Sequence, residues 1–228
     1  MKKIWITRAQ PGAEATAERV RALGFEPVVA PLLSLRALGD GPIDLAGVGA
    51  IAFTSANAVT AFAARSDARS LPVFAVGGAT AAAATAAGFS AVVSADGDGS
   101  ALASAIAARV GSLDGAVLHP AAAEPAGDLA RALGARGIES RTLAIYETVP
   151  AALSPWVRVQ IPHFHAVLLH SPKAARQLAA ILSRIAAPRL YICCLSPAVA
   201  APLRGLDLPR LHAAALPNED ALLNLIVD

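Results

Sequence analysis

Short apolar runs alternate along the chain with longer alanine-rich segments. The apolar runs are typical of β-strands buried on both faces of a sheet, and the alanine-rich segments are typical of helices. We expect strands at 3–7, 27–30, 48–54, 73–76, 91–94, 116–118, 165–169, 190–194 and 211–214, and an extended segment at 141–149. We expect helices at 12–23, 56–64, 79–87, 99–110, 124–135, 172–185, 197–203 and 219–226.

This regular alternation of strand and helix, with short connections, predicts the α/β fold class. Right-handed strand–helix–strand units build parallel sheets with helices on both faces. Two passages interrupt the alternation: residues 31–42 are rich in Gly and Pro, and residues 150–162 are rich in Pro. Both passages are candidate linkers because Gly and Pro break regular structure. The length of 228 residues leaves room for one large domain or two small ones.

A weak internal repeat favours two similar domains. Residues 49–63 and 165–179 each contain an apolar strand that ends in Ser, a short polar step and an alanine-rich helix. Residues 72–89 resemble residues 188–205 in the same way. The alternative is that strand–helix units of any parallel sheet look alike, so the repeat indicates duplication without establishing it.

The composition is unusually apolar, with 55% hydrophobic residues and a mean hydropathy of +0.54. Alanine, about a quarter of the chain, accounts for much of this. No run reaches the roughly 18–20 strongly apolar residues that a membrane-spanning helix needs. The N-terminal segment has only a short apolar stretch before Arg8, which does not form the core of a secretory signal. We therefore expect a soluble, cytoplasmic chain that does not bind membranes.

Charge and cysteine content exclude further classes of protein. The 19 basic and 17 acidic residues leave a net charge of +2, without the basic clusters that are typical of nucleic-acid binding. Cys193 and Cys194, the only cysteines, lie side by side in an apolar run. They are expected to be buried rather than paired in a disulfide. No second cysteine cluster is available for a structural zinc site.

Candidate chemistry gathers at the carboxyl ends of the expected strands. Ligands bind at that edge of an open parallel sheet, and the free amides of the following helix N-termini favour an anion. The residues there are mostly small or hydroxylated. This would suit a ligand with several carboxylates or phosphates, although Ser and Thr are also common helix caps. The candidates are Thr7, Arg8, Ser55, Asn57, Gly77, Thr80, His119, His170, Ser171 and Lys173.

Motif spacing does not support several other kinds of site. The chain has no G-x-G-x-x-G dinucleotide fingerprint, no phosphate-binding P-loop and no G-x-S-x-G nucleophile elbow. His163 and His165 could share a strand face, but no third ligand stands at a recognisable spacing, so we expect no metal. His119 and His170 could contact an anion or act as acid or base, although a partly exposed strand end is the simpler interpretation.

Carboxylate pairs are scarce, and one tyrosine stands out. Glu124 and Asp128 are four residues apart on an expected helix and indicate a solvated surface rather than a catalytic pair. Asp98, in a Gly-rich loop, could cap the helix that follows it. Tyr146, one of two tyrosines, stands beside the second candidate linker. Its phenol could donate a hydrogen bond or a proton at neutral pH, or its ring could simply pack on a neighbouring strand.

A series of short motifs resembles the uroporphyrinogen-III synthase family over nearly the whole chain. Each motif alone is weak, and their order and spacing carry the resemblance. The motifs are ITR at 6–8, LGF at 23–25, FTSANAV at 53–59, VGGATA at 76–81, AGF at 87–89, GSAL at 99–102, LGARG at 133–137, YET at 146–148 and LLHSP at 168–172.

The resemblance implies two flavodoxin-like parallel-sheet domains joined by a two-stranded β-ladder, with the active site in the cleft between them. The chain would cross twice between the domains. Domain 1 would then be discontinuous and comprise 1–35 and 150–228, while domain 2 would comprise 38–145. The linkers would lie near 34–41 and 145–150, close to the two Gly- and Pro-rich passages.

The resemblance further implies a lyase that uses neither a metal nor a cofactor. Its substrate would be hydroxymethylbilane, a linear tetrapyrrole octacarboxylate, which closes to uroporphyrinogen III with inversion of the last pyrrole ring. Loss of the hydroxyl as water gives an azafulvene. Attack on the substituted carbon of the terminal ring then gives a spiro intermediate that fragments and recombines. We expect a monomer that makes a transient contact with the preceding pathway enzyme.

The resemblance also assigns roles to residues. Tyr146 matches the family tyrosine that assists departure of the hydroxyl, as general acid or hydrogen-bond donor. The sequence departs from the family where Ser196 and Val199 replace a Gly and a Thr, and where His119 follows Leu118 in place of a glycine. The positions that would anchor substrate carboxylates are Thr7, Arg8, Ser55, Asn57, Gly77, Thr80, Ser100, Ser171 and Lys173.

Two other interpretations are weighed against the synthase. The first is a non-catalytic two-domain protein that binds a small polyanionic ligand, as periplasmic-type binding proteins do. The absence of a recognisable signal segment argues against it. The second is an enzyme with a nucleotide cofactor, which the missing fingerprints disfavour.

Overall fold

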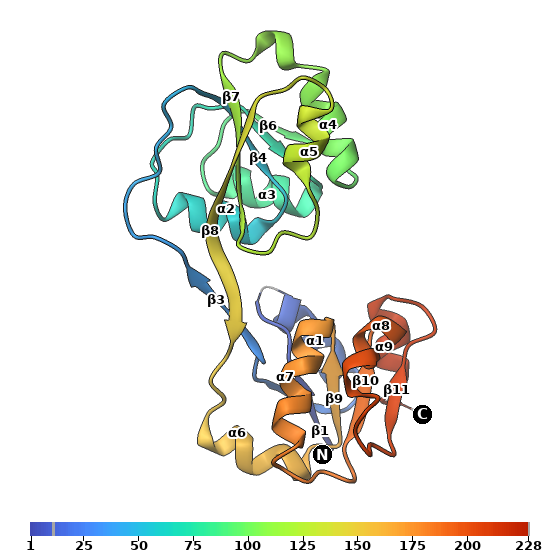
Figure 1. Ribbon diagram of the computed structural model, residues 1–228. Helices are drawn as coiled ribbons and strands as arrows, with labels where there is room; N and C mark the ends of the chain where they lie inside the picture. The colour runs from blue at the N-terminus through green and yellow to red at the C-terminus, as the bar shows by residue number, and fades with distance from the viewer. Residues whose placement is uncertain (11, 228) are drawn as a thin grey trace. The chain divides into compact units, whose positions relative to one another are not determined.

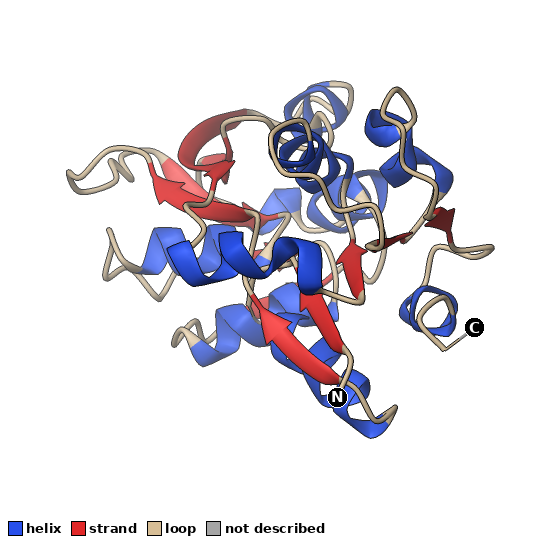
Figure 2. Ribbon diagram, turned by 90° about the horizontal axis from the view of Figure 1, so that it is seen from below, coloured by secondary structure: helices blue, strands red, loops and turns tan. Residues whose placement is uncertain are grey.

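The computed structural model describes residues 1–10 and 12–227, which form two compact units. Unit 1 comprises Met1–Ser34 and Val149–Asp228, and unit 2 comprises Leu35–Thr148. Each unit is built on a largely parallel sheet with helices on both faces, as Figures 1 and 2 show. The α/β fold class expected from the strand–helix alternation is confirmed.

Unit 1 contains a five-stranded sheet in the order β11-β10-β9-β1-β2, and all neighbouring strands are parallel. Counted in chain order within the unit, this is the flavodoxin-like order 2-1-3-4-5. The order reverses between β1 and β9, which makes this pair the topological switch point. The strands are β1 (Lys3–Ile6), β2 (Glu26–Val29), β9 (Ala166–Leu169), β10 (Tyr191–Cys194) and β11 (Leu211–Ala213).

Side chains alternate along each strand of unit 1, so the sheet buries two core clusters. Trp5 faces the cluster under α6, α7 and α8, while Ile4 and Ile6 face the cluster under α1 and α9. Cys193 and Cys194 likewise belong to opposite clusters, which explains why adjacent cysteines are free thiols. The helices are α1 (Gly12–Ala22), α6 (Pro155–Gln160), α7 (Pro172–Leu182), α8 (Pro197–Ala200) and α9 (Glu219–Asn224), with 3-10 turns η2 (Ile161–His163) and η3 (Ala201–Leu203).

Unit 2 contains a six-stranded sheet in the order β3-β8-β7-β4-β5-β6. Its strands are parallel from β8 to β6, and the order reverses between β4 and β7. Helices α2 and α3 cover one face, and α4 and α5 cover the other. The elements are β3 (Leu33–Ala37), β4 (Val48–Phe53), α2 (Ala56–Ala63), β5 (Val73–Ala75), α3 (Gly78–Ala86), β6 (Val92–Ser94), α4 (Gly99–Ala107), η1 (Val110–Ser112), β7 (Ala116–Ala122), α5 (Leu129–Gly134) and β8 (Ser140–Pro150).

The two sheets correspond strand by strand. The order β2-β1-β9-β10-β11 in unit 1 matches β8-β7-β4-β5-β6 in unit 2, so that β9 takes the place of β4 and β10 that of β5. These are the same pairs that the internal repeat relates, since 165–179 echoes 49–63 and 188–205 echoes 72–89. Unit 2 is therefore a circular permutation of the strand order of unit 1.

The chain passes between the units within β3 and β8, which are neighbours in the six-stranded sheet. The amide of Leu38 donates to the carbonyl of Ile145, and the amide of Ala151 donates to the carbonyl of Leu32, both at 2.9 Å. Residue numbers rise along one segment as they fall along the other, so the pair is antiparallel. Part of the Gly- and Pro-rich passage 31–42 is thus a strand, because it pairs with β8.

The expected strand 116–118 is too short, since β7 continues to Ala122. The amide of Ala116 donates toward the β4 side, and that of Val117 donates to Glu139 on the β8 side. Successive backbone amides of β7 point to opposite neighbouring strands, so the nitrogen of Pro120, like that of Ala116, points to the β4 side. On that side the pairing of β7 with β4 has already ended at Leu118. Proline is therefore tolerated in this strand, because no ladder hydrogen bond is lost.

Two further expectations are corrected. The helix expected at 124–135 begins only at Leu129, because Pro125 and Gly127 stand in its first part and Asp128 is the N-cap. The passage 150–162, expected as a linker, contains α6 and η2. The Ser154 side chain caps α6, and Pro155 fits its first position.

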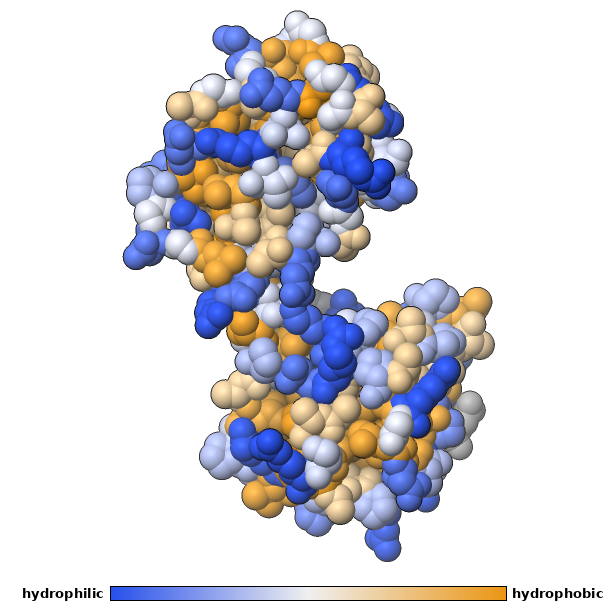
Figure 3. Space-filling model, in the orientation of Figure 1, coloured by the Kyte–Doolittle hydropathy of each residue, from blue (hydrophilic) through white to orange (hydrophobic). Residues whose placement is uncertain are grey.

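Alanine explains the high hydropathy of the chain. On the face seen in Figure 3, hydrophobic and hydrophilic residues are interspersed over both units. Within residues 1–10 and 12–227, no helix has both the length and the apolar character needed to cross a bilayer.

A close approach of backbone at the start of β7 yields a stability prediction. Gly115 has a φ of +126°, and an added Cβ would lie 2.4 Å from the Gly47 carbonyl oxygen. Gly115→Ala is therefore expected to lose about 2 kcal/mol or more of unfolding free energy, measured by urea denaturation. Gly134→Ala is the control, because nothing lies within 4 Å of its added Cβ. Equal midpoints for the two variants would contradict the strain at Gly115.

Candidate functional site

The carboxyl edge of the unit 2 sheet brings together polar side chains from three strands at the switch point. Thr54 and Ser55 directly follow β4. The Thr54 hydroxyl lies 3.1 Å from Nε2 of His119 on β7. The Ser55 hydroxyl lies 3.0 Å from the Tyr146 hydroxyl on β8. Consecutive hydroxyls at the end of the central strand thus hold an imidazole and a phenol.

The ring of Tyr146 packs in the core while its hydroxyl takes part in a hydrogen bond. Its side chain is only 8% exposed and belongs to the core cluster that includes Phe53 and Ile145, while its hydroxyl meets Ser55. The Ser55 oxygen also accepts the amide of Ala58 at 3.1 Å, as the N-cap of α2. When Ser55 donates its proton to Tyr146, the phenol keeps its own O–H for a ligand.

His119 is not the partly exposed strand end that the sequence suggests. It lies inside β7 and is only 2% exposed, because the strand continues past it. Burial lowers its pKa, so the imidazole is neutral at pH 7. Its Nδ1 has no partner among the described residues. His119 therefore supports Thr54 rather than offering a charge to an anion.

The helix starts of unit 2 differ in the amides they leave free. The N-cap of α3 is Gly77, which makes no side-chain hydrogen bond, and Gly78 and Ala79 behind it are exposed. Thr80 is buried, and its amide donates to the Gly77 carbonyl at 3.0 Å. Asn57 is exposed in the first turn of α2. The α3 start therefore offers an open pair of donors for a carboxylate.

The start of α4 is occupied by an internal carboxylate. Asp98 accepts the amides of Ser100 and Ala101 at 2.9 and 3.0 Å. The hydrogen bonds from Ala101 and Ser100 lower the pKa of Asp98, which keeps it ionised in this position. Ser100, expected to bind substrate, retains only its exposed hydroxyl for that role.

At the carboxyl edge of unit 1, Thr7 and Ser171 serve the fold first. Thr7 is buried and donates to the Leu168 carbonyl at 2.6 Å, which ties β1 to β9 at the switch point. Ser171 caps α7 by accepting the amide of Ala174 at 3.2 Å, and Pro172 after it has no N–H. Lys173 is half-buried in the first turn of α7. This edge therefore offers fewer free amides than α3 does.

A partly buried cluster joins Arg8, His170 and Thr16 to one carboxylate at this edge. Glu219, at the start of α9, accepts from the Thr16 hydroxyl at 2.6 Å, contacts His170 Nε2 at 3.0 Å and contacts Arg8 at 3.4 Å. Burial alone would raise the pKa of Glu219, but hydrogen bonds from His170 and Thr16 and the charges of His170 and Arg8 hold it at about 2. Sequence reasoning missed Glu219 because only the fold brings it to Arg8.

The described residues contain no group of three or more His, Cys, Asp and Glu side chains arranged to hold a metal ion. The thiols are also inert. Burial raises the pKa of Cys194 to about 12, and burial together with the neighbouring Cys194 raises that of Cys193 to about 12.

The family model for uroporphyrinogen-III synthase, described as Uroporphyrinogen-III synthase HemD, matches residues 14–224. The chain belongs to the uroporphyrinogen-III synthase family. The resemblance seen in the sequence motifs is thereby confirmed. Among curated protein sequences, no match was found.

Solved structures show the same fold as this synthase family member. The uroporphyrinogen-III synthetase of Helicobacter pylori is similar with a TM-score of 0.68 and 16% identity, over 100% of this chain and 99% of that chain. A mutant uroporphyrinogen III synthase of the extremely thermophilic bacterium Thermus thermophilus is similar with a TM-score of 0.50 and 15% identity, over 98% of this chain and 96% of that chain. Both likenesses bear on the fold alone.

In this synthase family member the expected site residues fall on two sheet edges. Tyr146 lies inside β8, and the others lie at or just beyond the carboxyl end of a strand in their own unit or in the helix turn that follows. The structure joins Ser55 to Tyr146 directly and joins Arg8 to Glu219. The residues of unit 2 are Ser55, Asn57, Gly77, Thr80, Ser100 and Tyr146, and those of unit 1 are Thr7, Arg8, Ser171 and Lys173.

The low pKa of Glu219 predicts a pH-dependent stability. Its folded pKa of about 2 lies below the ordinary value of 4.5, so its stabilisation is complete above pH 4.5 and is lost as pH falls toward 2. Glu219→Gln is expected to lower the free energy of unfolding by about 1–3 kcal/mol at pH 7. It should also weaken the loss of stability between pH 4.5 and pH 2, as measured by urea denaturation at several pH values. Asp220→Asn, which removes an exposed pair with Arg19, is the control and should change little. If the stability of Glu219→Gln fell with pH as it does in the wild type, this role of Glu219 would be ruled out.

Proposed function

We propose that the chain cyclises hydroxymethylbilane to uroporphyrinogen III, with inversion of the terminal pyrrole ring. The observation that carries the proposal is the Tyr146–Ser55 hydroxyl pair at the switch point of unit 2, in a chain of the synthase family. Ligands of open parallel sheets bind at such a point. A phenol held there by a serine is placed to act on the departing hydroxyl of a bound substrate.

The first step needs a proton donor. Tyr146 donates a hydrogen bond or its proton to the hydroxymethyl oxygen, which leaves as water and generates the azafulvene. The Ser55 hydroxyl, donating in turn to the Tyr146 oxygen at 3.0 Å, stabilises the negative charge that develops on the phenol. The proton lost when the last ring regains aromaticity restores the phenol. The overall loss is one molecule of water.

The later steps need control of conformation more than strong acids or bases. The azafulvene attacks the substituted carbon of the terminal ring, and the spiro intermediate fragments and recombines with that ring inverted. Unaided closure gives the symmetric isomer, so the protein must hold the two chain ends in the productive geometry. A site built from amides and hydroxyls, with a neutral His119 behind Thr54, suits this task.

We assign the substrate carboxylates to two kinds of group. In unit 2 the free amides at Gly78 and Ala79, with Asn57, offer neutral donors. In unit 1 Arg8 and Lys173 offer charge. The placement of the substrate in a cleft between domains 1–35 plus 150–228 and 38–145 rests on the family alone. We propose that the chain acts as a cytoplasmic monomer, to which the preceding pathway enzyme supplies the substrate.

The proposal is tested by supplying hydroxymethylbilane and resolving the porphyrin isomers after oxidation. The expected product is the type III isomer, formed faster than spontaneous closure. Pretreatment with EDTA should leave the rate unchanged, since the assigned groups include no metal. Only the type I isomer at the spontaneous rate would overturn the proposal. Saturable binding of hydroxymethylbilane without turnover would instead favour the alternative, a non-catalytic binding protein for a polyanion.

Tyr146 has its own test. Tyr146→Phe removes the hydroxyl and keeps the buried ring, so the fold is retained while kcat is expected to fall roughly 100-fold, at the low end for loss of a general acid. Tyr191→Phe, at the other tyrosine of the chain, is the matched control and should keep its activity. Full activity of Tyr146→Phe would remove Tyr146 from the mechanism and leave the family assignment intact.

A further inference from the structure

The amino edge of the unit 1 sheet, opposite to the candidate site, carries a second set of polar groups. Cationic residues stand at or just before the strand starts: Lys2 and Lys3 at β1, Arg189 near β10 and Arg210 before β11. All strand starts of a parallel sheet meet at one edge. Cations far apart in the sequence are therefore brought together here.

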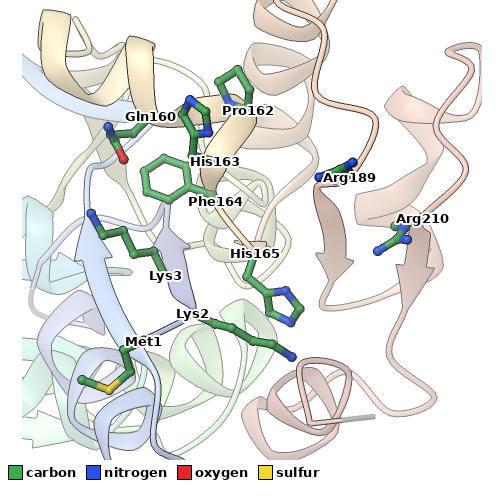
Figure 4. Close-up of a pocket in the computed structure, with 10 residues that line it drawn as sticks. All are labelled: Met1, Lys2, Lys3, Gln160, Pro162, His163, Phe164, His165, Arg189 and Arg210. Carbon is green, nitrogen blue, oxygen red and sulfur yellow. The ribbon is translucent and has the colours of Figure 1, made fainter.

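These cations line a cavity of about 550 Å³, shown in Figure 4. His163 and His165 line it too, and none of the described residues that line it is acidic. In Figure 4 the side chain of Lys2 extends toward the ring of His165, and Arg189 and Arg210 lie across the same space. The cavity thus presents positive charge from several sides.

Most of this charge is not neutralised by the protein. Within residues 1–10 and 12–227, the side chains of Lys2 and Arg189 make no hydrogen bond or ion pair. Lys3 reaches Glu26 only at 4.0 Å, and Arg210 lies over the Tyr191 ring, 4.5 Å from its centroid. Burial, followed by repulsion from Lys2 and Arg210, lowers the pKa of His165. An anion in the cavity would relieve this repulsion.

Backbone hydrogen bonds and ring contacts hold the strand starts at this edge together. The His165 amide donates to the Lys3 carbonyl at 2.9 Å, and the Ile192 amide donates to the Arg210 carbonyl at 2.8 Å. The His165 ring stacks on Phe25 with centroids 6.1 Å apart, and it makes a tilted contact with Tyr191 at 5.1 Å. These ring contacts fix the position of the imidazole beside the cations.

We propose that this cavity binds a small polyanion with two or more phosphate or carboxylate groups, at a site separate from the candidate active site. Several cations fixed around one space match several anionic groups on one molecule, whereas a monoanion can neutralise only part of the set. The site is independent of the proposed synthase reaction.

The test is calorimetric titration of the full chain, at low ionic strength, with inorganic pyrophosphate, citrate and acetate. Pyrophosphate, citrate or both are expected to bind at least tenfold more tightly than acetate, and more weakly as salt is added. Binding of one polyanion alone assigns the site to phosphate or to carboxylate. No saturable binding of either polyanion would overturn the proposal.

Variants locate the site. The double variant Lys2→Gln, Arg189→Gln is expected to weaken binding at least tenfold, because both side chains lose their charge without disturbing a contact. Arg176→Gln is the matched control, since Arg176 is an exposed cation on α7 that does not line the cavity. Wild-type affinity in the double variant would overturn the proposal.

Amide NMR shifts give a readout that distinguishes the two edges of unit 1. The ligand should shift the amides of Lys3, His165 and Leu211 at the amino edge. Shifts confined to Ser171 and Lys173 would place the anion at the carboxyl edge and overturn the proposal. The double variant should retain production of the type III isomer. The binding measurements do not involve the synthase reaction. Failure of the synthase assay in the wild type would therefore contradict the proposed function and not the polyanion site.

Discussion

Parallel pairing of the strands is the constraint from which the placement of chemistry follows. Each strand starts at one edge of its sheet and ends at the other, so the position of a residue relative to its strand decides which edge it serves. Residues that follow strands supply Ser55, Gly77 and Ser171 to the carboxyl edges. Residues that precede strands supply Lys2 and Arg210 to the opposite edge of unit 1. The fold thereby places neutral hydrogen-bond donors at the carboxyl edges and gathers positive charge at the amino edge of unit 1. It does so although the charge of the chain is nearly balanced and the sequence contains no cluster of charges.

The two carboxyl edges also differ in how they meet an anion. Unit 2 leaves the amides behind Gly77 open and fills those of α4 with Asp98. Unit 1 places proline at the first turn of α7 and α8, which removes donors, and its Arg8 and His170 are already in contact with Glu219. An incoming carboxylate at Arg8 therefore competes with an internal one, whereas a carboxylate at α3 meets unpaired amides. Under the proposed function, orientation of the substrate would rest mainly on neutral groups, which accords with the low overall charge.

The sequence carries much of this fold because its local signals agree with one another. Strands buried on both faces appear as apolar runs, and Ser55 and Ser171 follow two of them as helix caps, so the edges that bear the site could be anticipated. The extension of β7 through Pro120 could not, because it depends on where pairing with β4 stops. For the same reason the sequence places His119 at a strand end, whereas it lies inside a strand. Glu219 beside Arg8 and the cations at the amino edge are likewise products of topology, since their neighbours are distant along the chain.

The division of Cys193 and Cys194 between two core clusters has a practical consequence. Each thiol is sealed beneath a different helical layer, and its high pKa keeps it protonated and slow to react while that layer is closed. Labelling by a thiol reagent would then follow opening of the layer above each sulfur. The chain thus holds one reporter for each side of the same sheet, at adjacent positions on a single strand. Their relative labelling rates would tell whether the two layers of unit 1 open together as one cooperative body or separately.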